Sequence, residues 1–208
     1  SETRLIHRIG RRGLSGAVIE GIFAANSELV AVMDCDLQHD ETKLSDMIEL
    51  FSKNTSIDIV IGSRFTETGG ISDKAFSKIR ELGSKITTLL VKKILNINAS
   101  DPLSGFFMVK KETFLRSAES LQTQGFKILA DFLATSGKNI EIKEIGYRFK
   151  NRVAGESKMS FITVLELMGL VFSQLFQGRV SIRFILFCMV GLSGIFVQLF
   201  ITGTSMFL

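Results

Sequence analysis

The chain has 208 residues, of which 22% are charged and 46% are hydrophobic. This length accommodates one α/β domain with a hydrophobic core and a short extension, but excludes two full-sized domains. The formal net charge is +4, and no basic tract is interleaved with aromatic residues, so the composition argues against nucleic acid as a partner. The two cysteines, Cys35 and Cys188, stand in unrelated contexts and predict neither a disulfide framework nor a zinc site.

Helical and extended patterns alternate through the first three quarters of the chain. Short apolar runs predict buried strands over residues 28–33, 57–61 and 106–109, and an alternating pattern predicts a strand over 140–149 with an irregularity near Glu144. Apolar side chains at helical spacing predict helices over residues 15–26, 44–51, 73–95, 112–121 and 126–136. This alternation is typical of an α/β fold in which helices cover both faces of a mainly parallel sheet.

The last quarter of the chain is much more apolar. Residues 161–176 are amphipathic at best, and the 25 residues from 184 to 208 contain no charged side chain. About 20 apolar residues suffice to span a bilayer, so this run predicts a C-terminal transmembrane helix. A buried core helix is the alternative, but core helices rarely extend so far without a charge. Arg179 and Arg183 flank the run and would hold the globular domain on the cytoplasmic side.

An acidic turn, with the sequence DCDLQHD over residues 34–40, follows the first predicted strand. In open α/β sheets, ligands bind at the carboxyl ends of the strands. The carboxylates of Asp34 and Asp36 and the amide oxygen of Gln38 are hard ligands suited to Mg²⁺ or Mn²⁺ bridging a diphosphate. Such a metal would neutralise charge on a nucleotide leaving group. The alternative is an Asp-rich turn in which Asp40 caps the next helix, which explains Asp40 but not the other three.

Three further motifs follow the acidic turn. They are GSRF at residues 62–65 with Gly69-Gly70 just after it, SDPLSGFFMVKK at 100–111, and NRVAGESKMS at 151–160. The four motifs, in this order, resemble the polyprenyl-phosphate (dolichol-phosphate) mannosyltransferases of glycosyltransferase family 2, in particular the prokaryotic type. The resemblance covers most of residues 4–178. It implies a GT-A fold, the fold of nucleotide-diphospho-sugar transferases, and inverting transfer of a hexose from a nucleotide sugar to a polyprenyl phosphate.

The resemblance assigns the acidic turn to the donor and its metal. Asp34, Cys35 and Asp36 match a motif whose backbone and carboxylates hold the nucleotide sugar and the metal. Gln38 matches a further ligand of the Mg²⁺ or Mn²⁺ ion. Cys35 replaces the usual alanine, a small-for-small change that should leave metal binding intact.

The other motifs supply candidate phosphate and substrate contacts. Arg64 matches a donor-binding arginine, whose planar fork can bind phosphate oxygens in a bidentate manner. Arg152 and Lys158 match phosphate-contacting positions on a loop that closes over donor and acceptor, and together with Asp36 we expect Arg152 to act most directly in transfer. Asp101 and Ser104 match elements that could face the sugar or the acceptor. An ordinary surface cation or a turn cap is the alternative for these residues.

The resemblance also divides the chain. Residues 1–160 would form the catalytic domain, 161–178 an interfacial amphipathic helix, and 179–208 the start of a GtrA-like transmembrane domain. The family begins with a strand carrying a PxYNE-like segment and a second strand ending in acidic residues. Neither is found in this sequence, so we expect the chain to be a fragment that lacks the N-terminal strands.

The expected substrate pair is GDP-mannose and a dolichyl-type phosphate, used at the cell membrane for glycan or lipid glycosylation. One alternative is transfer of glucose or another sugar from a UDP-sugar to undecaprenyl phosphate. Another is an inactive membrane-anchored binding or scaffold module, although a scaffold would not need the acidic turn. A Rossmann dehydrogenase is excluded because no G-x-G-x-x-G follows a strand. His7 and His39 are expected to be ordinary polar residues rather than bases.

Overall fold

The computed structural model describes residues 3–10, 13–66, 68–71, 78–121 and 127–150, together with 184, 187–188, 190–195, 198 and 202. The chain divides into two compact units, Ser1–Ser157 and Lys158–Leu208. All the strands among the described residues belong to the first unit.

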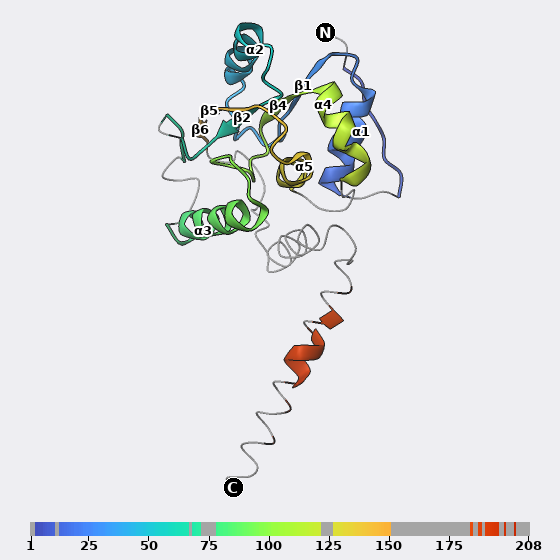
Figure 1. The fold of residues 1–208 in the computed structure, drawn as a ribbon, viewed down its shortest axis with the longest axis vertical. Coiled ribbons are helices and arrows are strands. Elements are labelled where there is room, and N and C mark those ends of the chain that lie inside the picture. The colour runs from blue at the N-terminus through green and yellow to red at the C-terminus, as the bar shows by residue number, and fades with distance from the viewer. Residues whose placement is uncertain are drawn as a thin grey trace. The chain divides into compact units, whose positions relative to one another are not determined.

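Strands and helices alternate through the first unit (Figure 1). The strands are β1 (Leu29–Val32), β2 (Ile59–Ser63), β3 (Gly70–Ile71), β4 (Phe107–Lys110), β5 (Ile142–Gly146) and β6 (Arg148–Phe149). The helices are α1 (Leu14–Ala24), α2 (Lys43–Lys53), α3 (Lys78–Leu95), α4 (Lys111–Ser117) with a 3₁₀ turn over Ala118–Ser120, and α5 (Ile128–Ser136). Each predicted element is present within a few residues of its expected bounds. The short strand β3 was not predicted, and the irregularity expected near Glu144 lies at Tyr147, between β5 and β6.

The main sheet is mixed, so the prediction of a mainly parallel sheet is wrong for the described residues. The strand order is β1-β4-β2-β5, and β4 runs antiparallel to both of its neighbours. Only β2 and β5 pair in parallel within this sheet, while β3 and β6 form a separate parallel pair. A strand that is buried on both faces gives the same apolar run in either direction. The sequence pattern therefore indicated β4 but not its direction.

The direction of β4 brings several chain segments to one edge of the sheet. Val32 of β1 and Ile61 of β2 both lie opposite Phe107, and Ser63 lies opposite Gly146 of β5. Because β1, β2 and β5 run the same way and β4 runs against them, three carboxyl ends meet one amino end. The acidic turn, the residues after β2 and the turn before β4 therefore share this edge.

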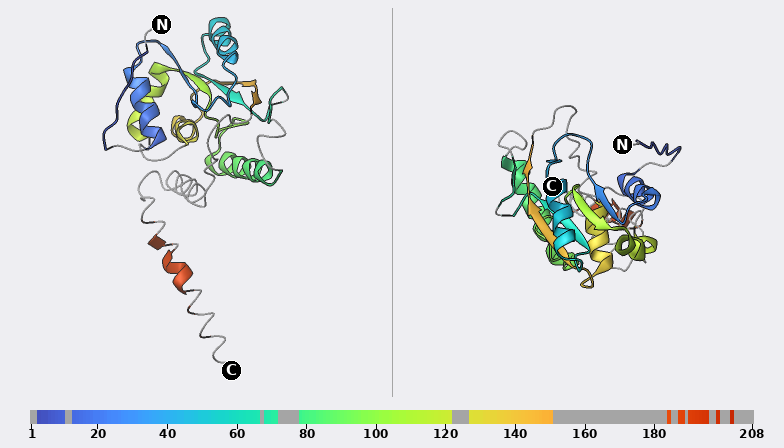
Figure 2. Two further views of the ribbon diagram at one scale, coloured as in Figure 1. Left: turned by 180° about the vertical axis from the view of Figure 1, so that it is seen from behind. Right: turned by 90° about the horizontal axis from the view of Figure 1, so that it is seen from above.

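Helices cover both faces of the sheet. On one face, Met47 and Phe51 of α2 pack against Val60 of β2 in a cluster of aromatic and aliphatic side chains. Helices α1, α4 and α5 lie together and apart from α2 (Figures 1 and 2). Phe114 of α4 and Phe132 of α5 stack with their ring centroids 5.2 Å apart. The strands that carry the functional edge are thus held by packed helices on both sides.

In the second unit, the described residues 190–195 are helical, and Val190 and Ile195 expose their apolar side chains. Within the part of the chain that the structure describes, no helix is both long enough and apolar enough to cross a membrane. Most of the run 184–208 and all of the segment 161–176 lie outside the described residues. The transmembrane and interfacial helices remain predictions.

Candidate active site at the sheet edge

The acidic turn leaves β1 and reverses sharply. Leu37 has a φ of 60°, in the left-handed region that residues with a Cβ rarely adopt. The Asp36 carboxylate accepts the backbone N–H of Gln38 at 3.2 Å, while Cys35 is exposed. The Asp34 side chain is 43% exposed. The turn therefore presents carboxylates near solvent while Gln38 is buried beneath it.

Gln38 joins the acidic turn to the residue after β6. Its side-chain amide nitrogen donates to the backbone carbonyl of Lys150 at 2.9 Å, and the backbone carbonyl of Gln38 accepts the Lys150 N–H at 2.9 Å. Because the Lys150 carbonyl can only accept, the side-chain nitrogen of Gln38 faces it and the side-chain oxygen does not. Lys150 directly precedes the motif with Arg152 and Lys158, which lies outside the described residues.

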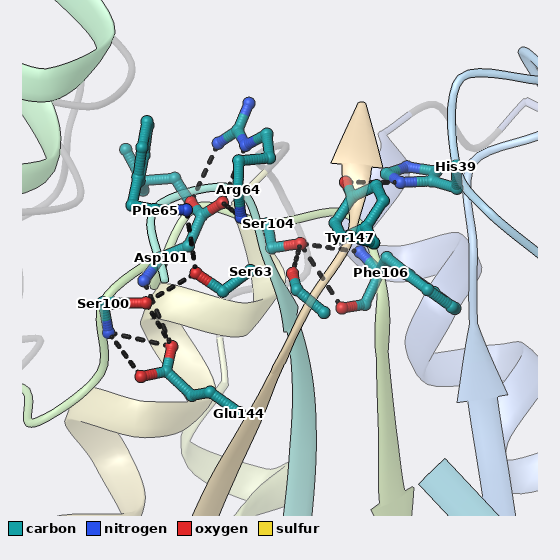
Figure 3. A network of polar contacts seen from close by, with 12 residues as sticks. His39, Ser63, Arg64, Phe65, Ser100, Asp101, Ser104, Phe106, Glu144 and Tyr147 are labelled. Carbon is teal, nitrogen blue, oxygen red and sulfur yellow. Dashed lines mark hydrogen bonds and ion pairs between the residues drawn. The ribbon is translucent and has the colours of Figure 1, made fainter. Parts of the chain in front are cut away.

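Arg64 follows β2 and binds Asp101, which precedes β4 (Figure 3). Arg64 Nε lies 2.7 Å from Asp101 Oδ2, and Nη2 lies 2.8 Å from Oδ1. The Asp101 side chain is 0% exposed and that of Arg64 is 12% exposed. Burial alone lowers the pKa of Arg64, but the hydrogen bond and charge of Asp101 raise that pKa above its ordinary value, so the guanidinium stays charged.

This pair bears on the role expected for Arg64. Two nitrogens of the fork that was predicted to bind phosphate oxygens, Nε and Nη2, are bound to Asp101, and phosphate binding by Arg64 stays a prediction. The rings of Phe65 and Phe149 lie 5.2 and 5.5 Å from the guanidinium carbon. A carboxylate and two aromatic rings therefore fix the Arg64 side chain in place.

Glu144 of β5 holds the turn that carries Asp101 (Figure 3). Its carboxylate accepts the Ser100 N–H at 2.9 Å, the Ser100 hydroxyl at 2.7 Å and the Asp101 N–H at 3.4 Å. The Ser100 and Ser63 hydroxyls lie 2.5 Å apart. The Arg64–Asp101 pair is thus supported by a partly buried network that links β2, β5 and the turn before β4.

Ser104 is buried, and its hydroxyl is used within the protein. It donates to the carbonyl of Gly62 at 2.7 Å and accepts the N–H of Phe106 at 3.1 Å. These bonds close the turn before β4 against the end of β2. The sugar or acceptor contacts expected of Ser104 and Asp101 remain predictions, since each side chain also has this structural role.

His39 and Tyr147 form part of the site, which sequence reasoning did not predict. His39 Nδ1 lies 2.7 Å from the Tyr147 hydroxyl oxygen, and His39 Nε2 lies 3.6 Å from Asp34 Oδ2. His39 is 5% exposed and Tyr147 is 1% exposed. The position of His39 inside the acidic turn was the one available signal, whereas nothing local connected it to Tyr147.

The pattern of Glycosyl transferase family 2 matches residues 1–116, more than half of the chain. The chain belongs to glycosyltransferase family 2. The resemblance indicated by the four motifs is thereby confirmed at the level of the family.

Curated relatives of this family 2 chain share one name. The dolichol-phosphate mannosyltransferase of Pyrococcus furiosus is 37% identical over 200 residues, which cover 94% of this chain and 54% of the relative. That of Mycosarcoma maydis is 35% identical over 157 residues, covering 75% of this chain and 52% of the relative. The family 2 chain thus spans about half the length of these relatives.

Solved structures with low sequence identity share the fold. Mannosyl-3-phosphoglycerate synthase from Rubrobacter xylanophilus has a TM-score of 0.55 at 18% identity, covering 81% of this chain and 53% of that chain. Glucosyl-3-phosphoglycerate synthase from Mycobacterium tuberculosis, in complex with Mg²⁺ and UDP, has a TM-score of 0.53 at 13% identity and covers 79% and 55%. The same enzyme with Mn²⁺, UDP-glucose and phosphoglyceric acid has a TM-score of 0.51 at 16% identity, with the same coverage. The family 2 chain has a GT-A-like fold with a mixed sheet and covering helices.

The acidic turn of the family 2 chain has the chemistry of a divalent metal site. Among the described residues, no three or more His, Cys, Asp or Glu side chains are grouped to hold a metal ion. Mg²⁺, however, commonly takes only one or two carboxylates and completes its shell with substrate phosphates and water. Asp34, Asp36 and the Gln38 amide oxygen are ligands of this chemical kind, and the ligand set stays a prediction.

The backbone of Gly105 packs directly against the Asp34 carboxylate. A Cβ at Gly105 would overlap Asp34 Oδ2 and lie 2.9 Å from its Cγ. The Ser104-Gly105 element therefore brings the turn before β4 into direct contact with the acidic turn. Only glycine lets the backbone approach this closely.

We expect Gly105→Ala to displace the Asp34 carboxylate and to weaken Mn²⁺ binding in the presence of a nucleoside diphosphate by about tenfold. The displaced atoms are the tip of one side chain, so the fold should persist. Isothermal titration with Mn²⁺ checks the affinity. Gly21→Ala is the matched control, because a Cβ there meets open space. Unchanged affinity in Gly105→Ala would contradict a metal-binding role for Asp34.

Lys127 is a further cation of this site that was not predicted. Its ammonium donates to the Leu103 carbonyl at 3.4 Å, in the turn before β4. The pKa of Lys127 is lowered from 10.5 to about 8, chiefly by burial and also by the charge of Arg64, while the charges of Asp101 and Asp34 oppose this shift. Lys127 therefore lies close to the charged groups at the sheet edge.

The lowered pKa of Lys127 predicts a pH-dependent stability. Between about pH 8 and 10.5 the unfolded chain keeps the Lys127 proton and the folded chain loses it, so this residue's contribution to stability rises with pH. The slope for one proton is at most about 1.4 kcal/mol per pH unit. We expect urea unfolding at pH 7.5, 8.5 and 9.5 to show that the free energy of unfolding of the wild type rises with pH relative to that of Lys127→Met.

The control for this measurement is Lys53→Met, at an exposed position on α2. It should follow the wild-type pH profile. A constant difference between wild type and Lys127→Met across the three pH values would mean that Lys127 does not titrate in this range when folded.

Proposed function

We propose that the protein transfers a hexose, with inversion, from a nucleotide sugar to a polyprenyl phosphate. The observation that carries this proposal is the convergence of the acidic turn and the Arg64–Asp101 pair at one edge of the sheet. The carboxylates that would bind a metal and the fixed Arg64 guanidinium then face the same place, as a diphosphate leaving group requires. The family and the shared name of the curated relatives support the choice of mannose and of a dolichyl-type acceptor.

In this proposal, Asp34, Asp36 and Gln38 hold Mg²⁺ or Mn²⁺. The ion supplies charge neutralisation for the diphosphate when it is bound. Crystal structures of a fold neighbour contain Mg²⁺ with UDP and Mn²⁺ with UDP-glucose, which supports a divalent ion. Cys35 contributes its backbone to donor binding beside these ligands.

The cations orient the phosphates. Arg64 offers its Nη1 edge, because its other edge is bound to Asp101. Arg152 and Lys158 would add phosphate contacts from the segment after Lys150. The acceptor phosphate is already ionised at neutral pH, so the residues need not remove a proton and their work is positioning and charge stabilisation.

We place the enzyme at the cell membrane with its catalytic domain on the cytoplasmic side. Residues 161–178 would lie at the interface, and residues 179–208 would begin a transmembrane domain of the GtrA-like type. The support is the uncharged apolar run after Arg183 and the need to reach a lipid-linked acceptor.

The test is to supply membranes containing the protein with radiolabelled GDP-mannose or UDP-glucose and with dolichyl or undecaprenyl phosphate. The expected result is Mg²⁺- or Mn²⁺-dependent transfer of mannose to the dolichyl phosphate. Labelled lipid from UDP-glucose alone would assign the donor to the alternative class. No labelled lipid from either donor, under conditions where the protein binds the nucleotide, would overturn the proposed function.

A further inference from the structure

His39, the sixth residue of the acidic turn, is enclosed by aromatic rings. Its ring centroid lies 5.4 Å from that of Phe106, 5.5 Å from that of Tyr147 and 5.6 Å from that of Phe149. Both His39 and Tyr147 are almost fully buried, so water does not compete for their polar atoms. The imidazole therefore has one orientation, set by its packing and by the Tyr147 hydroxyl 2.7 Å away (Figure 3).

The two neighbours of His39 favour one tautomer of its ring. His39 Nε2 lies 3.6 Å from Asp34 Oδ2, which is longer than a hydrogen bond, and because a carboxylate can only accept, this contact favours the ring with hydrogen on Nε2. Nδ1 is then an acceptor, and the Tyr147 hydroxyl donates to it at 2.7 Å. Burial raises the pKa of Tyr147, which keeps this hydroxyl protonated. The three groups form a chain from Tyr147 through His39 to Asp34.

The Asp34 carboxylate contacts the protein on its inner side. Oδ2 faces His39 and lies over the backbone of Gly105, whereas the side chain as a whole is 43% exposed. We propose that His39 and Tyr147 are positioning residues that orient the Asp34 carboxylate toward the divalent cation. The inference rests on the proposed function, because it assumes that Asp34 binds the metal.

Such outer partners set the affinity of a metal site. Groups that fix the orientation of a ligating side chain typically change metal affinity by about 10–100-fold when they are removed. A purely structural His39 would fill the aromatic pocket, and an apolar ring of similar size would replace it without consequence for the metal. A positioning role predicts that substitution weakens metal binding while stability is unchanged. A structural role predicts no change in metal binding.

The experiment measures Mn²⁺ binding to the purified protein in the presence of GDP, from the electron paramagnetic resonance signal of free Mn²⁺. The double variant His39→Phe/Tyr147→Phe removes both polar partners together and keeps the rings, so its stability should stay near that of wild type. We expect its Mn²⁺ dissociation constant to rise about tenfold or more. His39→Gln keeps an N–H donor and should bind Mn²⁺ within about threefold of wild type.

Thr113→Val is the control for nonspecific loss of stability. Its buried hydroxyl donates to Asp58 at 2.7 Å, before the amino end of β2 and away from the acidic turn. This variant should melt at a lower temperature with unchanged Mn²⁺ affinity.

The outcomes separate the two proposals. If the wild type binds Mn²⁺ and the double variant binds it equally well, His39 and Tyr147 are structural and the inference is wrong. A loss of affinity in His39→Gln as large as in the double variant would also overturn it. If the wild type binds no Mn²⁺ with GDP present, the metal site of the proposed function fails, and the role of His39 fails with it.

Discussion

Asp36→Ala is expected to abolish sugar transfer while the protein remains folded. A bound divalent ion contributes several kcal/mol of charge stabilisation, so losing a ligand should lower the rate by about a thousandfold. In the folded protein the Asp36 carboxylate accepts a 3.2 Å hydrogen bond from the Gln38 N–H, and losing such a bond costs about 1 kcal/mol. Initial rates with labelled donor, together with the thermal melting temperature, check both expectations.

The matched control is Asp40→Ala in the same turn. The Asp40 carboxylate accepts the backbone N–H of Thr42, the residue directly before α2, at 3.3 Å, which agrees with the role at the helix start considered from the sequence. It also accepts the Thr42 hydroxyl at 2.8 Å, and this hydrogen bond lowers the pKa of Asp40. Asp40→Ala should retain transfer within a few-fold. Substantial turnover by Asp36→Ala, or by wild type after metal removal, would refute the metal role.

Asp101→Ala is expected to lower the stability of the first unit more than any surface change. The Asp101 carboxylate is 0% exposed and binds Arg64 through two hydrogen bonds of 2.7 and 2.8 Å. Removing one partner of a buried pair typically costs 3–5 kcal/mol, because the other charge stays buried, which corresponds to a fall of roughly 6–20 °C in melting temperature. Thermal and urea unfolding would measure this loss.

The double variant Arg64→Met/Asp101→Leu separates stability from function. Replacing both charges by apolar side chains of similar size should recover most of the stability. It should not recover transfer, since the proposal requires the Arg64 cation. Arg116→Ala is the control, because Arg116 forms an exposed pair with Glu112 that contributes at most about 1 kcal/mol. Wild-type transfer by the double variant would remove Arg64 from the proposed phosphate site.

The local patterns of the sequence predicted the types of the elements and much of the edge. Apolar spacing indicated α2, because burial on one face gives a periodic pattern, and a continuous apolar run indicated β2, which is buried along its whole length. The acidic turn could be recognised from the sequence because its residues are neighbours in the chain. The sequence does not indicate the direction of β4, because a short buried strand has no polar face to mark its orientation.

The interactions missed from the sequence are those between distant residues. Arg64 and Asp101 are separated by 37 positions and His39 and Tyr147 by 108. The first pair forms because β4 runs antiparallel to β2, so the turn before β4 meets the end of β2, and the second because β1 and β5 end at the same edge. Neither pair could be inferred without the strand order. Lys127 was missed for the same reason, as its lowered pKa depends on burial and on neighbouring charges that the fold assembles.

The central position of β4 also has a consequence for biosynthesis. The residues that pair with β4 lie about 50 and about 80 positions earlier in the chain, in β2 and β1. Those two apolar strands are not neighbours in the sheet, so during translation neither can pair with β4 until residue 110 has left the ribosome. Sheets assembled from such distant segments form slowly and expose apolar edges in the meantime. Nascent chains in which β4 has not yet emerged should therefore depend more on chaperones than those in which β4 can pair with β1 and β2.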